Sequence, residues 1–242
     1  MRALSAEEVL RVWERGLAQP PVARPLAILA QVEPDATVAA LARLPLGQRE
    51  RRLLDVRAAT FGRELAARGA CPACGETMDF AFLASAPASA RGYAPDTAPL
   101  HLGDFVIQLR SPNTTDLLAA AGCRTIEEAQ RLLANRCMVT VTRDGVEAAP
   151  ADVPDQLLAA VSAHVEAIDP DADSQVQVQC PSCASRCDYP VDVGAFFWAE
   201  IEIETMKLLR DVHRLASAYG WHEADILSMS PARRQAYLEL LP

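Results

Sequence analysis

Two short cysteine motifs constrain this chain most strongly, because they are suited to bind one metal ion together although they lie far apart in the sequence. Both have the form C-P-x-C: Cys71 and Cys74 make up the first, and Cys180 and Cys183 the second. Two cysteines on a tight turn supply one edge of the tetrahedron of soft ligands that Zn(II) prefers, so two such turns complete a site. The sequence therefore predicts one structural Zn(II) per chain, bound by these four cysteines.

The two motifs also belong to an internal repeat. CPACGETMDF at 71–80 aligns with CPSCASRCDY at 180–189 through both cysteines, the proline, the aspartate and the aromatic residue that follows it. Alternating residues predict a strand over 77–82, after the first motif, and another over 175–179, before the second. Two cysteine turns on paired strands form a zinc ribbon, which here is split by a long insertion.

The remaining cysteines are expected to have other roles. Cys187 aligns with Met78, which favours an apolar strand residue, although its use as an alternate ligand stays open. Cys123 and Cys137 have no partner at ligand spacing, and isolated cysteines are usually small buried apolar residues. A redox function for the pairs is disfavoured, because a thioredoxin-like motif needs a single CxxC at a helix N-terminus.

The rest of the pattern predicts an α+β, mainly helical fold. Helical periodicity is evident over 47–67 before the first motif and over 195–219 after the second, where Gly220 is placed as a C-cap. Between the motifs, strand-like and helix-like segments alternate, and 84–99 has the Ala, Ser and Pro content of a linker. The predicted organisation is an N-terminal helical region, a split zinc ribbon, an inserted α/β region and a C-terminal helical region, at 1–69, 70–83 with 175–193, 84–174 and 194–242 respectively.

Charge limits the classes of partner. Lys and Arg total 23 against 32 Asp and Glu, a net charge of −9, which disfavours a general binder of nucleic acid. The basic residues gather on the helix before the first motif, where they predict either a solvated face or a docking face for an acidic partner. These residues are Arg49, Arg51, Arg52, Arg57 and Arg63.

No enzyme and no small-molecule substrate are expected. Four thiolates close the coordination shell, whereas a catalytic zinc keeps an open position. The four histidines have no metal or nucleophile spacing, and there is no glycine-rich phosphate loop. Asp169, Asp171 and Asp173 resemble the opening of a calcium loop, but Ser174 and Cys180 stand where Gly and Glu are required, so a polar turn is expected.

The start of the chain predicts a cytoplasmic protein. MRALSAEEVLRVWERG has acidic residues where a signal peptide needs an apolar stretch, and no apolar run is long enough for a membrane span. Thiols stay reduced in the cytosol, where paired cysteines favour metal binding over disulfides.

Several longer stretches resemble a family of tailed-phage and contractile-injection proteins related to the T4-type baseplate hub assembly protein. They are LPLGQRERRLLDVRAATFG at 44–62, FVIQLRSPNTTDLLAAAG at 105–122, RLLANRC at 131–137 and FFWAEIEIETMKLLRDVHRLASAYGWHEADILSMSPARRQAYLELL at 196–241. The resemblance implies a non-enzymatic baseplate component or assembly chaperone that contacts hub or spike proteins. It would act in the bacterial cytoplasm and could remain in the assembled particle.

The C-terminal segment carries the candidate partner-binding residues. Trp221, Arg233, Arg234 and Tyr237 combine the aromatic and arginine content favoured at binding hot spots. The alternative function is a zinc-ribbon module that binds nucleic acid or acts in transcription. Against it, the residues around the cysteine turns are mainly acidic, with only Arg186 in the immediate loops.

Overall fold

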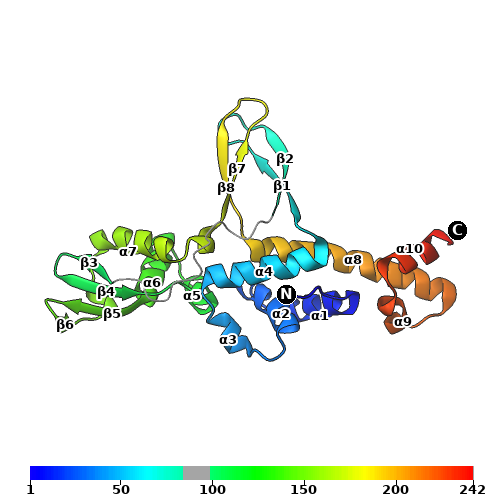
Figure 1. Cartoon of the computed structure of the whole chain (residues 1–242), viewed down its shortest axis with the longest axis horizontal. Coiled ribbons are helices and arrows are strands. Elements are labelled where there is room, and N and C mark those ends of the chain that lie inside the picture. The colour runs from blue at the N-terminus through cyan, green and yellow to red at the C-terminus, as the bar shows by residue number, and fades with distance from the viewer. Residues whose placement is uncertain (84–98, 242) are drawn as a thin grey trace.

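The described residues form four parts, which Figure 1 shows as an elongated body with a projecting pair of hairpins. The computed structural model describes residues 1–83 and 99–241. The fold is α+β with helices predominating, as expected. The predicted linker at 84–99 lies almost wholly outside the described residues. Among the described residues, no helix is both long enough and apolar enough to cross a bilayer.

A helical body occupies the centre of Figure 1 and packs around one long helix, α8. It comprises α1 Ala6–Leu17, α2 Arg24–Val32, α3 Val38–Ala42, α4 Leu46–Phe61 and α8 Val193–Tyr219. Ser5 and Glu8 form the predicted capping box at the start of α1. Gly220 ends α8 in the left-handed conformation, at φ 70°, as its position in the sequence predicted.

Close aromatic packing joins α8 to its neighbours in the body. Phe197 is fully buried and meets Phe61 edge to face, with ring centroids 5.8 Å apart. Trp198 lies directly on Gly16 of α1, where an added Cβ would come within 2.2 Å of the Trp198 ring. Glycine at this position therefore allows α1 and α8 to approach closely.

The prediction of a helix reaching residue 67 is wrong. α4 ends at Phe61, and Gly62 follows with φ 95°, a conformation that disfavours residues with a side chain. A strand, β1 Glu64–Ala70, then begins within the region assigned to helix. The backbone reversal at Gly62 sets the boundary, and helical periodicity alone did not reveal it.

The prediction of a solvated or docking arginine face on α4 is also wrong for its two most buried members. Arg49 is 6% exposed and Arg57 3% exposed. Arg49 pairs with Glu50 at 2.6 Å, and Arg57 pairs with Glu200 of α8 at 2.5 Å. Both charges are satisfied inside the body, because buried arginines need carboxylate partners.

The inserted unit lies at one end of the molecule (Figure 1). Its strands form one antiparallel sheet in the order β3-β4-β5-β6, so the insertion predicted as α/β is an α+β unit. The elements are β3 Leu100–Leu102, β4 Phe105–Leu109, α5 Thr114–Ala120, α6 Ile126–Cys137, β5 Met138–Arg143, β6 Val146–Glu147 and α7 Asp155–Ile168. Cys137 is buried in the core of this unit, as expected of an isolated cysteine.

An aspartate fastens the inserted unit to the helical body. Asp169, 3% exposed, accepts hydrogen bonds from the backbone N–H of Gly47 at 2.9 Å and from the Ser111 hydroxyl at 2.5 Å. A Cβ on Gly47 would lie 2.0 Å from Oδ1 of Asp169, so only glycine fits there. The residues predicted to form a polar turn fold as a short 3-10 helix, Pro170–Asp173, and Asp169 before it caps the start of α4.

The C-terminal tip comprises the end of α8, α9 Glu223–Ser228 and α10 Pro231–Glu239. Figure 1 places it at the end opposite the inserted unit. Leu215, Ile226 and Leu238 form its small buried core.

Candidate metal centre

The predicted split ribbon consists of two hairpins that project side by side from the helical body (Figure 1). We call them the double hairpin. Strands β1 Glu64–Ala70 and β2 Thr77–Leu83 make the first, and β7 Gln175–Gln179 and β8 Arg186–Pro190 make the second. The predicted strands at 77–82 and 175–179 are confirmed, and each also has an antiparallel partner that alternation did not predict.

The two cysteine turns have the same backbone geometry. In the first, Cys71 N–H donates to the Glu76 carbonyl and Gly75 N–H to the Cys71 carbonyl, both at 2.8 Å. In the second, the equivalent bonds to Ser185 and from Ala184 are both 2.9 Å. The fourth residue after each first cysteine is left-handed, at φ 77° in Gly75 and 61° in Ala184. The sequence repeat is therefore a structural repeat.

The four predicted ligands converge on one point. All four Sγ atoms lie within 4.8 Å of one another. The Cys71–Cys183 and Cys74–Cys180 Sγ separations, which cross between the hairpins, are both 3.7 Å. A tetrahedral metal with Zn–S bonds of about 2.3 Å needs sulfurs about 3.8 Å apart. The cluster is therefore compatible with a zinc site.

Hydrogen-bond donors favour the thiolate form at two of the four sulfurs, the form in which cysteine binds a metal. The backbone N–H of Cys74 lowers the pKa of the Cys71 thiol to about 6. The Ser185 hydroxyl and N–H lower the pKa of Cys183. The N–H of Glu76 acts in the same direction on Cys74, but the neighbouring Cys183 thiol and burial outweigh it and raise the pKa of Cys74 to about 12. Cys74 therefore retains a proton that a metal ion would displace on binding.

Cys187 lies beside the cluster without completing it. Its Sγ is 3.7 Å from that of Cys71 and it is 2% exposed, in the same inner layer as Met78. Burial raises the pKa of the Cys187 thiol, which favours its protonated form. In this form the thiol donates a hydrogen bond to Sγ of Cys71. Its place in the strand agrees with the sequence alignment, which paired it with Met78.

Few side chains hold the two hairpins together apart from the cysteines. Tyr189 stacks on Phe80 with centroids 5.2 Å apart, and its hydroxyl donates to the Ala70 carbonyl at 3.1 Å. A Cβ on Gly69 would lie 2.7 Å from the Tyr189 ring, so glycine allows the ring to rest on β1.

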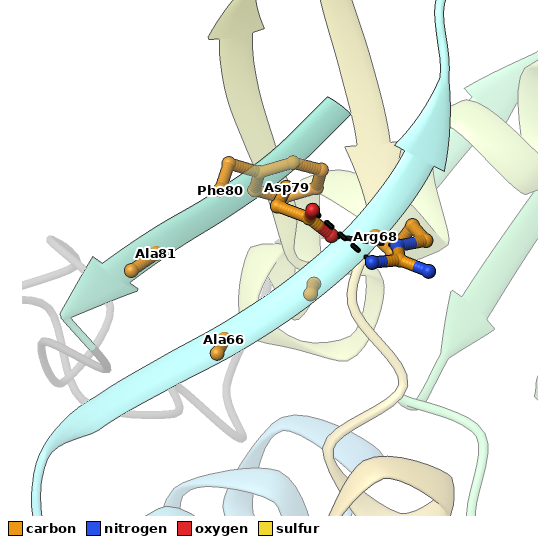
Figure 2. Close-up of a pocket in the computed structure, with 6 residues that line it drawn as sticks. Ala66, Arg68, Asp79, Phe80 and Ala81 are labelled. Carbon is orange, nitrogen blue, oxygen red and sulfur yellow. Dashed lines mark hydrogen bonds and ion pairs between the residues drawn. The ribbon is translucent and has the colours of Figure 1, made fainter. Parts of the chain in front are cut away.

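The outer face of the first hairpin carries a shallow hollow, shown in Figure 2. Arg68 and Asp79 lie opposite each other on β1 and β2 and form a bidentate ion pair. Arg68 Nε donates to Asp79 Oδ1 at 2.6 Å, and Nη2 donates to Oδ2 at 3.1 Å. The second hairpin repeats this pair as Gln177 and Asp188, joined by a hydrogen bond of 2.9 Å. The charge of Arg68 is therefore already neutralised by a carboxylate.

The predicted partner-binding residues lie on the C-terminal tip, and one of them is not on the surface. Arg233 is exposed and stands over the Tyr237 ring at 5.7 Å, while Trp221 and Tyr237 are half-buried and in edge contact at 4.8 Å. Arg234 is only 3% exposed and pairs with Asp211 of α8 at 3.3 Å. Its assignment as a surface contact is corrected, because helix α10 turns it towards α8.

The fold and the cysteine cluster first define a class: a mainly helical α+β protein with a four-thiol centre on two hairpins that are distant in the sequence. Residues 27–198 match the family model described as T4 bacteriophage base plate protein. The match spans well over half of the chain, which therefore belongs to this family, as the resemblance predicted. No curated protein and no solved structure gives a significant match.

The matched range includes both cysteine motifs and the whole inserted unit. It ends at Trp198, so nearly all of the C-terminal stretch at 196–241, which also suggested the resemblance, lies beyond it. Family membership makes the chain a phage baseplate component and does not specify what the C-terminal tip does.

Proposed function

We propose that this baseplate protein acts without catalysis, as an assembly chaperone or structural component that contacts hub or spike proteins and carries one structural Zn(II). The observation that carries the proposal is the four-thiol cluster within the family-matched range, where cysteines from both ends of a long insertion come within 4.8 Å. Such a centre fixes the geometry of a surface rather than performing a reaction.

The donor set supports a structural metal. Cys71, Cys74, Cys180 and Cys183 supply four thiolates, which fill a tetrahedral shell and leave no position for substrate or water. In the described residues of the double hairpin, the other buried side chains are Leu65, Met78 and Cys187. A core this small needs a staple to remain folded.

The C-terminal tip supports a contact function. Tyr219 and Trp221 stack at 4.5 Å, and Tyr237 meets both rings edge-on. The cluster keeps part of its aromatic surface exposed beside Arg233, at one end of an elongated molecule (Figure 1). Rigid aromatic groups flanked by arginine are typical of interface hot spots.

The nucleic-acid alternative has little support. Arg68 on the first hairpin is paired with Asp79, and Gln177 stands at the matching place on the second. Affinity for phosphates depends on clustered, unpaired positive charge. A salt-dependent shift of a labelled duplex by the purified, metal-loaded protein would favour this alternative.

The proposal is tested by metal analysis and co-purification. The tagged full chain, co-expressed with the hub and spike proteins of a phage-like particle, is expected to contain one zinc and to retain at least one of these proteins. Arg233→Glu should weaken the complex, while Arg124→Glu, an exposed arginine in the inserted unit, should not. A metal-free, stable chain would contradict the zinc centre, and no retention by the wild type would contradict the contact function.

A further inference from the structure

A pocket of about 390 Å³ lies where the inserted unit meets the helical body. Its exposed wall is mainly apolar and combines the start of α4, the segment before α5, the end of α7 and the 3-10 helix that follows α7. The apolar lining residues are Leu46, Pro112, Val165, Pro170 and Ala172. Such a wall suits a hydrocarbon stem, and the charged groups around it determine what that stem should carry.

Two exposed carboxylates line the same pocket without a cationic partner. Glu166 has neither a hydrogen bond from its side chain nor an ion pair among the described residues. The Asp173 carboxylate accepts a long hydrogen bond from the neutral Gln175 amide, at 3.4 Å, and pairs with no cation within the described ranges. Both carboxylates are open to solvent, so a ligand that enters the pocket can reach them.

A third carboxylate, that of Asp169, belongs to the buried part of the wall. Asp169 is 3% exposed, and its hydrogen bonds from Gly47 and Ser111 both go to Oδ2. No cation pairs with it in the part of the chain that the structure describes, although buried charges are usually paired. Its charge acts on the pocket through space and needs no direct contact with a ligand.

The end of α7 adds negative charge of another kind. The last carbonyls of a helix carry the negative end of its dipole, which basic residues in the last turn commonly offset. α7 has no basic residue there and carries Glu166 instead, followed by three aspartates within the next seven residues. Arg51 offsets one of these charges by pairing with Asp171 at 3.4 Å. Such a local conflict is expected where a surface is shaped for a ligand rather than for stability.

We propose that this pocket binds a cationic side chain with an aliphatic stem, a lysine or an arginine presented by a partner protein. Glu166 and Asp173 contact the cation, Asp169 and the end of α7 add negative potential, and the apolar wall holds the stem. A metal ion suits the pocket less well, because apolar side chains offer it no oxygen ligands. The carrier rests on the proposed contact function, whereas the chemistry of the pocket does not.

Amide and methyl NMR of the metal-loaded full chain at low ionic strength tests the pocket with small probes. N-acetyl-lysine methylamide and N-acetyl-arginine methylamide represent the two basic side chains, and N-acetyl-norleucine methylamide is the uncharged control. At least one basic probe is expected to shift the signals of Leu46 and Val165 saturably, with the uncharged probe binding at least about tenfold more weakly. The tighter of the two basic probes identifies the side chain.

Variants of the exposed carboxylates keep the test decisive, because surface substitutions should leave the fold intact. Glu166→Gln and Asp173→Asn should each weaken binding of the basic probe about threefold, and together about tenfold. Glu147→Gln is the matched control, since Glu147 is exposed at the edge of the inserted sheet and does not line the pocket. It should leave the affinity unchanged.

Equal binding of the basic and uncharged probes would overturn the proposal, as would an unchanged affinity in the double variant or saturable shifts confined to other regions. Displacement of the basic probe by an equal concentration of Ca²⁺ would also overturn it, in favour of a metal ion.

Co-purification tests the carrier separately. Glu166→Lys should reduce the amount of baseplate protein retained, and undiminished retention would contradict a partner's side chain as the ligand. Binding of a basic probe without any retained baseplate protein would contradict the contact function and leave the chemistry of the pocket standing. Retention without probe binding would contradict the pocket alone.

Discussion

The helical body buries Phe197, Ile201 and Leu208 almost completely, together with many other apolar side chains from several helices. The double hairpin, in contrast, has five buried residues among those described: Leu65, Cys71, Met78, Cys180 and Cys187. Two of these, Cys71 and Cys180, are candidate metal ligands. The body has the kind of core that stabilises a domain of this size through apolar burial, whereas the hairpins have almost none.

The two regions are therefore stabilised in different ways, the body by apolar packing and the double hairpin by the proposed metal. A two-stranded hairpin is marginal in water unless something else fixes it. Here the two hairpins share a thin aromatic contact through Tyr189 and a set of four thiols that come from opposite ends of the insertion. The body should therefore fail when packing is lost, and the double hairpin when the metal is lost.

Loss of a zinc ligand is expected to have the largest effect and to destabilise the double hairpin but not the helical body. Cys71→Ser should abolish zinc binding and unfold the double hairpin, because structural metal binding is coupled to folding and contributes on the order of 10 kcal/mol. Metal analysis and amide hydrogen exchange over β1, β2, β7 and β8 provide the readout. The helical body should keep slow exchange.

Cys123→Ser is the matched control, since Cys123 lies in the inserted unit, away from the four-thiol cluster. It should retain one zinc per chain and protected hairpins. Retention of zinc by Cys71→Ser, with the hairpins still protected, would mean that Cys187 or another group replaces the lost ligand.

The second-largest loss of stability is expected from a substitution in the core of the helical body. Phe197→Ala should lower the free energy of unfolding by about 3–5 kcal/mol, because it leaves a cavity against Phe61. Ile203→Ala on the same helix removes a side chain that is 71% exposed and should cost less than about 0.5 kcal/mol. Denaturant unfolding followed by far-UV circular dichroism measures both. Equal losses in the two variants would show that α8 is not packed as described.

The helical body and the double hairpin should lose stability at different pH values as the solution is acidified. The Arg2 guanidinium hydrogen-bonds the Glu8 carboxylate and lowers its pKa from 4.5 to about 2. A depressed carboxyl pKa stabilises the fold above pH 4.5, and this contribution is lost as the pH falls towards 2. Thiolates lose zinc to competing protons, so we expect the double hairpin to unfold at a higher pH than the body.

Arg2→Ala should lower the stability of the helical body at pH 7 only slightly, because the Arg2 side chain is 50% exposed and its pairing with Glu8 is screened by solvent. Its unfolding free energy should then vary less between pH 4.5 and 2 than that of the wild type. Parallel pH profiles for the two proteins would contradict this role of Arg2.

The smallest expected effect compares the two hairpins with each other. Gly75 and Ala184 occupy equivalent left-handed positions, at φ 77° and 61°. Gly75→Ala should therefore destabilise the metal-loaded double hairpin by about 1 kcal/mol, and Ala184→Gly should stabilise it by about 0.5–1 kcal/mol. Chelator-induced unfolding measures both. Changes of the same sign in the two variants would show that the turns are not equivalent.

Much of the local structure was predictable because its causes are local. The capping box at Ser5, the αL glycine at 220 and the alternation over 175–179 each depend on neighbours a few residues away. The candidate ligands were found because C-P-x-C is itself a local turn motif. One error, the helix extended to residue 67, came from the local backbone reversal at Gly62. The others fell where burial depends on distant partners, as with Arg57, whose carboxylate partner Glu200 lies on another helix.

The two cysteine turns, their repeat and the mainly helical character of the chain could be predicted from the sequence, because turn geometry and helical period are properties of short segments. The folded structure was needed to show that the two turns meet, that Asp169 fastens the inserted unit to α4, and that Arg234 is buried against α8. These outcomes depend on how distant segments pack, and desolvation and ion pairing act between groups that the sequence does not place side by side.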